Sequence, residues 1–200
     1  MEKIIQAFIP AYFLLFFLVA FAGKSLWVQR KTGKQVIQFP KDGSANSLVG
    51  FYFKWMLIAL FAYSLIQFVY PGFLNGLSPV RFLENHWIRV TGILVMLFSF
   101  LWVVKAQMDM RDSWRIGIDK NEKTALIQQG LFRFSRNPIF LGMLMALTGL
   151  FAIQPNLLTL FFFILATVLI QIQIRLEEEY LEKNHGDQYL KYKKETKRML

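Results

Sequence analysis

Two clusters of polar side chains adjoin apolar runs in the second half of this 200-residue chain. The first lies in residues 128–142, QQGLFRFSRNPIFLG, where Ser135, Arg136 and Asn137 directly precede an apolar run. Asn137 is suited to cap a helix that begins at Pro138, and the unpaired N–H groups at a helix start attract anions. This cluster is therefore suited to bind the negatively charged part of a water-soluble ligand.

The second cluster interrupts the end of the last apolar run, in LIQIQIRLEEEYLEKNHGDQYLKYKK. If a helix continues through it, Gln173 and Glu177 share one face, while Arg175 and Glu178 share a neighbouring face. Three consecutive acids near a helix C-terminus oppose the helix dipole if the helix ends there. The acids therefore need either a longer helix or a positive partner, and a cationic ligand would supply that partner.

Each cluster also has a simpler interpretation. Arg133 and Arg136 could be interfacial anchors beside interfacial aromatic residues. The segment around Arg175 could be an amphipathic surface helix held by Arg–Glu pairs. The presence of both clusters, brought together by the elements between them, favours a ligand site.

The elements that must position these clusters are apolar runs long enough to form membrane helices. A helix needs about 20 apolar residues to cross about 30 Å of hydrocarbon. Only Gln154, Pro155 and Asn156 separate the last two runs, which predicts an antiparallel helical hairpin that brings the two clusters close. The five candidate spans, of which the fourth is short, are about 4–22, 50–70, 88–104, 138–153 and 157–174.

Composition supports the same fold class. The chain is 55% hydrophobic and only 18% charged, against about 25% charged in soluble domains. We expect an all-α polytopic membrane protein with about five transmembrane helices, a C-terminal helical hairpin and an amphipathic cytoplasmic tail. Residues 1–104 would form a three-span bundle, and residues 105–200 would form the cofactor-binding region.

The positions of Lys and Arg predict the orientation. Most of the 23 basic residues fall in the segments 23–49, 105–137 and 175–200, which alternation of the spans puts on one side. The positive-inside rule makes that side cytoplasmic and places the N-terminus outside. We expect an integral protein of a bacterial inner membrane.

Several partner classes are not expected. The chain has no Cys and two His, one in a predicted outer loop and one in the tail, so no metal site is predicted. The net charge of +10 is accounted for by orientation and attraction to membrane lipid, and no nucleic-acid recognition motif is present. The sequence leaves the oligomeric state open.

Two ordered blocks resemble the isoprenylcysteine carboxyl methyltransferase-like family of integral membrane methyltransferases. One hairpin separates them, as in that family, and the resemblance covers about residues 115–198. The first block consists of Leu126, Ile127, Gly130, Phe132, Arg136, Asn137, Pro138, Phe140 and Gly142. The second consists of Glu177, Glu178, Leu181, Gly186, Tyr189 and Tyr192.

The resemblance implies S-adenosylmethionine as the cofactor, held in a cytoplasmic pocket beside the last two spans and the C-terminal helix. A carboxylate such as Glu177 or Glu178 would suit its sulfonium and ammonium groups. Aromatic side chains such as Phe132 and Phe140 would form an apolar slot for adenine. The cofactor-binding residues implied are Thr124, Ala125, Leu126, Ile127, Phe132, Asn137, Pro138, Ile139, Phe140 and Glu177.

The remaining site residues concern catalysis and the methyl acceptor. Arg115, Arg175 and Glu178 are the candidate catalytic residues, and Gln173 and Arg175 are the candidates for contact with the substrate. Gln173 stands where the family's eukaryotic prenylcysteine enzymes carry an Arg for the substrate carboxylate, which argues against prenylcysteine as the acceptor. Asn137 stands where the family often has His.

We therefore expect methyl transfer from S-adenosylmethionine to a lipophilic or lipid acceptor at the cytoplasmic face of the membrane. One alternative is an NADPH-dependent membrane reductase of steroid-reductase-like layout, which would need extra Arg or Lys around the pocket. The other is a non-catalytic membrane protein of the same fold. The sequence leaves the acceptor open, and with it whether O, N or S receives the methyl group.

Overall fold

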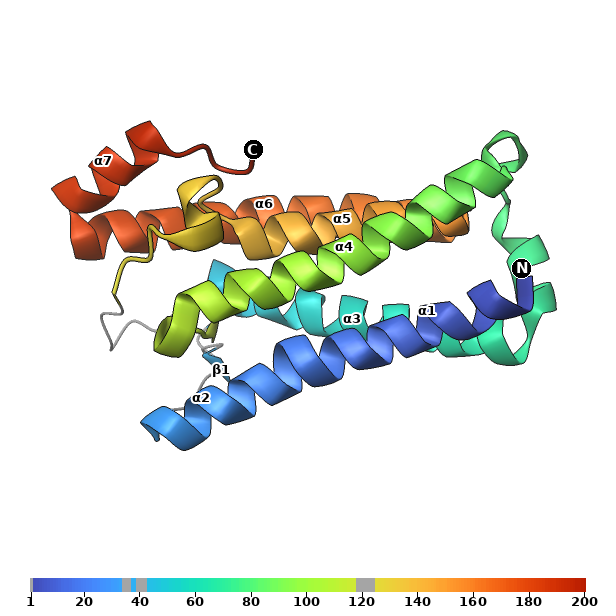
Figure 1. The fold of residues 1–200 in the computed structure, drawn as a ribbon, viewed down its shortest axis with the longest axis horizontal. Coiled ribbons are helices and arrows are strands. Elements are labelled where there is room, and N and C mark those ends of the chain that lie inside the picture. The colour runs from blue at the N-terminus through green and yellow to red at the C-terminus, as the bar shows by residue number, and fades with distance from the viewer. Residues whose placement is uncertain (1, 34–36, 39–42, 118–124) are drawn as a thin grey trace.

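The computed structural model describes residues 2–33, 37–38, 43–117 and 125–200. Its helices lie roughly along one long axis, with the N-terminus near one end of the bundle and the C-terminal segment at the other (Figure 1). The principal helices are α1 (Glu2–Phe16), α2 (Lys24–Thr32), α3 (Ala45–Val69), α4 (His86–Met110), α5 (Pro138–Ile153), α6 (Leu157–His185) and α7 (Asp187–Glu195). The all-α prediction is confirmed.

Short elements connect these helices. The only strands in the described part of the chain are β1 (Ile37–Gln38) and β2 (Ile116–Gly117), which pair in parallel. The connections also contain four short 3-10 helices, η2 (Pro71–Leu77), η3 (Arg81–Leu83), η4 (Arg111–Ser113) and η5 (Gly130–Arg133).

Four helical stretches are long and apolar enough to cross a membrane: Lys3–Thr32, Ala45–Val69, His86–Ser113 and Leu157–His185. The fifth expected span, α5, has 16 residues and is about 24 Å long, shorter than the hydrocarbon layer of about 30 Å. Its predicted shortness is confirmed.

The first span is longer than expected. Helical structure does not stop near residue 22 but passes through a π-helical stretch, η1 (Phe17–Gly23), into α2. The wide turn leaves the Ala20 carbonyl accessible, and the Gln107 side chain on α4 donates a hydrogen bond to it at 2.6 Å. This contact joins the first span to α4.

Helices α4 and α5 pack most closely. A Cβ atom added at Gly92 would lie 2.8 Å from the Gly149 carbonyl oxygen, and one at Gly142 would lie 2.4 Å from a Val103 methyl group. Small residues let two helix backbones approach in this way. The packing fixes the position of α5, and therefore of the polar residues that precede it.

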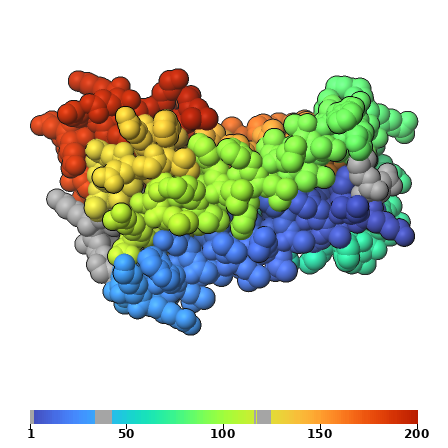
Figure 2. Space-filling model, viewed as in Figure 1, coloured from blue at the N-terminus to red at the C-terminus, as the bar shows by residue number. Residues whose placement is uncertain are grey.

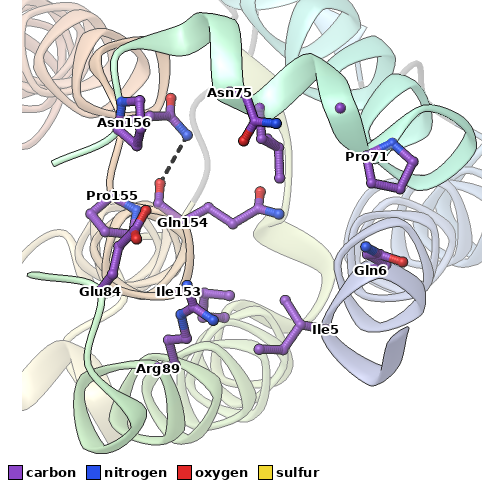
Figure 3. Close-up of a pocket in the computed structure, with 13 residues that line it drawn as sticks. Ile5, Gln6, Pro71, Asn75, Glu84, Arg89, Ile153, Gln154, Pro155 and Asn156 are labelled. Atoms are coloured by element: carbon purple, nitrogen blue, oxygen red, sulfur yellow. Dashed lines mark hydrogen bonds between the residues drawn. The ribbon is translucent and has the colours of Figure 1, made fainter. Parts of the chain in front are cut away.

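The link between α5 and α6 is a tight turn with a buried polar network, as the predicted hairpin requires. The Asn156 side chain accepts hydrogen bonds from the N–H groups of Leu158 and Thr159, both at 3.0 Å. Its amide nitrogen donates to the Gln154 carbonyl (Figure 3) and to the Tyr63 hydroxyl. The network anchors α3 to the hairpin.

Helix α6 continues without a break through the acidic cluster to His185 and ends at Gly186, which has φ +48°. The chain then turns into α7 and returns, so that the C-terminal residues lie against the turn before α5 (Figure 2). The return brings the two sequence clusters to the same end of the bundle.

Candidate active site

A cavity of about 120 Å³ lies between the turn before α5, the acidic part of α6 and the segment that follows α4. Seven of the predicted site residues line it: Arg115, Ala125, Leu126, Ile127, Phe132, Asn137 and Glu177. The other lining residues are Met110, Ser113, Gly117, Arg136, Tyr180, Leu181 and Tyr192. The predicted position Thr124 lies outside the described residues.

The turn η5 that carries Phe132 depends on a glycine. Gly130 has φ +62°, and a Cβ atom there would lie within 2.7 Å of all the carboxylate atoms of Asp109. That carboxylate accepts a hydrogen bond from the Leu131 N–H at 2.9 Å and forms an ion pair with Lys105. Asp109 therefore ties the turn to the end of α4 and directs Phe132 into the cavity wall.

Tyr192 of α7 holds the same turn from the other side. Its hydroxyl donates a hydrogen bond to the Phe132 carbonyl oxygen at 2.6 Å. Burial raises the pKa of the Tyr192 phenol above its ordinary value of about 10, so the phenol keeps the proton that this bond needs. The C-terminal helix is thereby fixed to the cavity.

Helix α5 begins at Pro138, as predicted, with Asn137 as the preceding residue. The Asn137 side chain does not cap the helix; its amide donates to the Arg198 carbonyl oxygen at 2.9 Å. The first N–H groups of α5 therefore have no side-chain cap. An uncapped helix start next to a cavity is suited to an anionic group.

Glu177 provides the negative charge in the cavity wall. Its carboxylate accepts a hydrogen bond from the Gln173 amide at 2.9 Å, and no ion pair of Glu177 occurs among the described residues. The side-chain amide oxygen of Gln173 is buried and accepts no hydrogen bond among the described residues. The positive charge of Arg115 also acts on Glu177 across the cavity, but the two form no ion pair. A carboxylate without an ion-pair partner in a cavity wall is suited to a positively charged ligand group.

Arg115 and Tyr180 form a second pair at the cavity. The Arg115 guanidinium lies over the Tyr180 ring, 5.2 Å from its centre. Both residues line the space. The pair presents an aromatic surface from α6 and a positive charge from the segment after α4.

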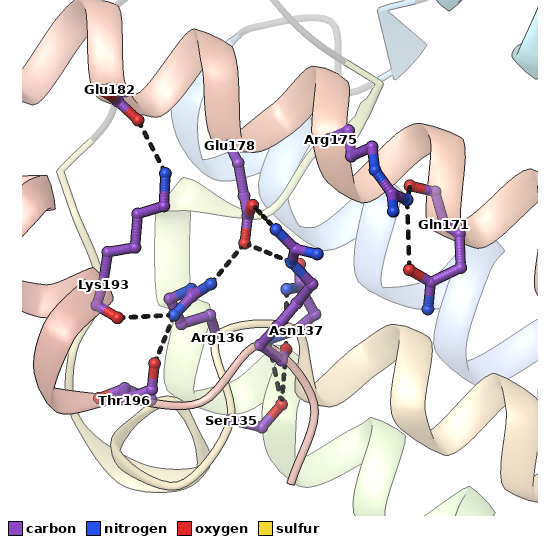
Figure 4. Close-up of polar contacts among 10 residues, drawn as sticks. Ser135, Arg136, Asn137, Gln171, Arg175, Glu178, Glu182, Lys193 and Thr196 are labelled. Carbon is purple, nitrogen blue, oxygen red and sulfur yellow. Dashed lines mark hydrogen bonds and ion pairs between the residues drawn. The ribbon is translucent and has the colours of Figure 1, made fainter.

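Glu178, the neighbour of Glu177, is held elsewhere. It accepts from Arg136 at 2.7 Å and from Arg198 at 2.8 and 3.1 Å. Figure 4 shows Arg136 pointing toward Glu178. Arg136 also donates to the carbonyl oxygens of Lys193 and Thr196. Glu178 thus joins α6 to the turn before α5 and to the C-terminal segment, and it does not line the cavity.

Arg175 lies on an exposed side of α6. Its guanidinium donates to the Gln171 carbonyl oxygen at 2.9 Å, away from Glu178 (Figure 4). Among the other predicted positions, Gln173 contacts Glu177, and Ile139 packs against a small cluster that contains Trp114 and Val28. Pro138, Ile139 and Phe140 do not line the cavity.

Sequence reasoning missed several lining residues. Tyr180 and Leu181 follow Glu177 by three and four positions on α6, so helical spacing alone would have indicated them. Met110, Ser113 and Gly117 reach the cavity because the chain turns back after α4, and no sequence pattern marks that turn. Arg136 appeared in the sequence motif, but its contacts to the C-terminal segment were not foreseen.

The fold and this site define an integral membrane protein with a polar cavity at one end of its helical bundle. The sequence model of the phospholipid methyltransferase family matches residues 87–188, just over half of the chain, and the protein belongs to that family. The family is part of the isoprenylcysteine carboxyl methyltransferase-like group, so the resemblance is confirmed. A search of curated proteins gave no match.

The family match covers α4, α5 and α6 and ends at the start of α7. It indicates a methyltransferase. It includes both clusters from which the site is built.

Proposed function

We propose that the protein transfers the methyl group of S-adenosylmethionine to a lipid-like acceptor at the membrane face that carries the C-terminal segment. We further propose that this face is cytoplasmic. The observation that carries the proposal is Glu177, a carboxylate in the cavity wall that makes no ion pair among the described residues and accepts a hydrogen bond from the Gln173 amide. Family membership supports the chemistry and a lipid-like acceptor.

The residues present fit the cofactor. Glu177 would receive the ammonium of its amino-acid group. The uncapped start of α5, or Arg115, would receive its carboxylate. Phe132, Tyr180 and Tyr192 provide aromatic surface for adenine.

The cavity encloses part of such a molecule rather than the whole of it. Its volume of about 120 Å³ is below the range of about 300–1,000 Å³ usual for ligand pockets. Its wall includes Gly117 and Ala125, and the chain between them lies outside the described residues. The charged groups named above line the enclosed part.

The protein's own residues would act by binding and orientation. When bound, the cofactor supplies an electrophilic methyl group, to which an acceptor O, N or S bonds in line as the carbon–sulfur bond breaks. Glu177 and the start of α5 would fix the two ends of the donor's amino-acid group, which sets the direction of transfer. The apolar surfaces of the bundle would admit a lipid-like acceptor from the bilayer.

The charges around the cavity bear on the reductase alternative. An NADPH site needs positive side chains for the 2′-phosphate. Of the two arginines that line the described cavity, Arg136 is already bonded to Glu178. This arrangement favours the methyltransferase over the reductase.

The experiment is a transfer assay with methyl-labelled S-adenosylmethionine. The purified protein, reconstituted in bilayers of mixed phospholipid, is expected to move the label into the organic-extractable lipid fraction. The control omits the protein, and a parallel sample contains NADPH with an oxidised lipid in place of the methyl donor. Label that stays in the aqueous fraction, together with NADPH consumption, would contradict the proposal.

A further inference from the structure

A second and larger cavity lies at the other end of the bundle. It has a volume of about 380 Å³, within the usual range for ligand pockets, and Figure 3 shows its lining residues. It is formed by the start of α1, the turn η2, the loop before α4, the start of α4 and the α5–α6 turn. None of its lining residues belongs to the candidate active site.

The walls of this distal cavity are held in place. The Gln154 side chain accepts from Tyr63 at 2.7 Å and donates to Gln67 at 3.0 Å, and Gln67 in turn donates to the Gln6 carbonyl oxygen. The Val80 N–H donates to the Pro155 carbonyl oxygen at 2.7 Å, which fixes the loop before α4 on the hairpin turn. The cavity is therefore part of the fold.

Charged and amide groups line it. Glu84 and Arg89 bring opposite charges to the same space, and the side-chain amides of Gln6 and Asn75 lie across from them (Figure 3). The Glu84 carboxylate makes no ion pair or hydrogen bond among the described residues. A carboxylate, a guanidinium and neutral amides together are suited to a ligand that carries both an ammonium and a phosphate.

The surroundings of the distal cavity match the depth of lipid headgroups. It lies where α3 ends and where α4 and α6 begin, at the ends of three candidate spans. The neighbouring side chains of Tyr70, Phe82 and Trp87 are exposed, and aromatic residues of this kind concentrate at membrane interfaces. The other part of its lining, from Ile5, Leu74 and Ile153, is apolar.

We propose that the distal cavity binds the zwitterionic headgroup of a bilayer phospholipid, with its ammonium at Glu84 and its phosphate at Arg89. This lipid is not the acceptor undergoing methyl transfer. Asn137 and Gln154 flank α5, a helix about 24 Å long, and each lines a different cavity. The proposal does not depend on the methyltransferase assignment.

The test is hydrogen exchange of the detergent-purified protein during titration with dihexanoyl phosphatidylethanolamine. Exchange is followed in peptides that cover 71–84 and 150–156, because these report the distal cavity and not the candidate active site. We expect the lipid to slow exchange there. Glu84→Gln and Arg89→Gln should each raise the half-effective lipid concentration about tenfold, since each removes one charge-assisted contact.

Arg81→Gln is the matched control. It removes a positive charge, as Arg89→Gln does, and lies in the loop that carries Glu84, but Arg81 does not line the cavity, so the titration should not change. Glu84→Gln removes no described side-chain contact, which keeps the test valid if Arg89→Gln is unstable. If the lipid bound only at the active site, neither Glu84→Gln nor Arg89→Gln would change the lipid titration.

Two other probes distinguish a zwitterionic phospholipid from its free headgroup and from an anionic phospholipid. Glycerophosphoethanolamine carries the same charges without acyl chains and is expected to give no protection at the same concentration. Dihexanoyl phosphatidylglycerol lacks the ammonium and should bind about tenfold more weakly. Equal protection by either probe, no protection by phosphatidylethanolamine, or titrations unaffected by Glu84→Gln would overturn the proposal.

Discussion

Glu177 and Glu178 are adjacent in the sequence but have different surroundings. Glu178 is bonded to two arginines and is buried among them. Glu177 accepts a hydrogen bond from the neutral Gln173 amide, makes no ion pair among the described residues and faces the cavity. A helix turns by about 100° per residue, so consecutive acids point in different directions. The two carboxylates are thus suited to different tasks, one to the ligand and the other to the fold.

Replacing Glu177 tests its proposed contact with the cofactor. We expect Glu177→Gln to weaken binding of S-adenosylhomocysteine by about tenfold or more, because a charged hydrogen bond contributes about 1.5–3 kcal/mol. Binding of the lipid acceptor should change less. The measurement is calorimetric titration of both variants with the cofactor product.

Glu179→Gln is the matched control for that titration. Glu179 is the next acid in the cluster, is exposed and does not line the cavity. It should bind the cofactor product as the unaltered protein does. Equal affinities for all three proteins would contradict the assignment of Glu177.

At the level of elements, the C-terminal segment closes the active-site end of the bundle. The Arg136 N–H donates to the Lys197 carbonyl oxygen at 2.9 Å, and Arg136 and Arg198 converge on Glu178. The side chains of Arg136 and Glu178 are each only 8% exposed, so the pair is shielded from water. These contacts connect α6, the turn before α5 and the chain after α7.

Glu178→Gln should therefore destabilise the protein. It leaves a buried arginine without its counter-charge, and breaking such a pair costs about 3–5 kcal/mol. Arg198→Gln should cost clearly less, because the Arg198 side chain is partly exposed and Arg136 would still bind Glu178. Thermal unfolding in detergent measures both. Equal losses of stability in the two variants would show that Glu178 does not have this central position.

The sequence predicted most of the helices but not all of their ends. Apolar length and the three-residue link gave the α5–α6 hairpin, since so short a link leaves the chain few options. The prediction that the first span ends near residue 22 is wrong, because the helical structure continues to Thr32. A π-helical stretch carries it past residue 22, and nothing in the composition marks that stretch. For α6, the sequence left open whether the helix continued or a positive partner was present. Both occur.

The candidate active site, like the helix ends, could be predicted only in part from the sequence. Residues on one turn or one helix face, such as Phe132, Asn137 and Glu177, follow from motif and spacing. Met110 and Ser113 enter the cavity through tertiary contacts, which local sequence does not encode. Arg175 was chosen for its charge, and the structure directs it along its own helix to Gln171.

The whole molecule has a cavity at each end of the bundle, with α5 between them. Basic residues at the active-site end, including Lys24, Arg30 and Lys105, support a cytoplasmic location for that end. The charge pattern therefore predicts the orientation of the bundle.

Because the chain has no Cys, single substitutions can test this orientation. Gly76→Cys places a thiol at the distal end, where a Cβ atom meets nothing within 4 Å, and Lys194→Cys places one on α7. A membrane-impermeant maleimide added to intact cells should label the first variant only. Labelling of the second variant alone would reverse the orientation.

Calorimetric titration of the purified protein with S-adenosylhomocysteine tests the central claim most directly, because the claim is that the cavity beside Glu177 holds this cofactor. The account predicts one binding site of micromolar affinity, lost to a large extent in Glu177→Gln. Absence of binding by the folded protein, with NADPH binding in its place, would contradict it.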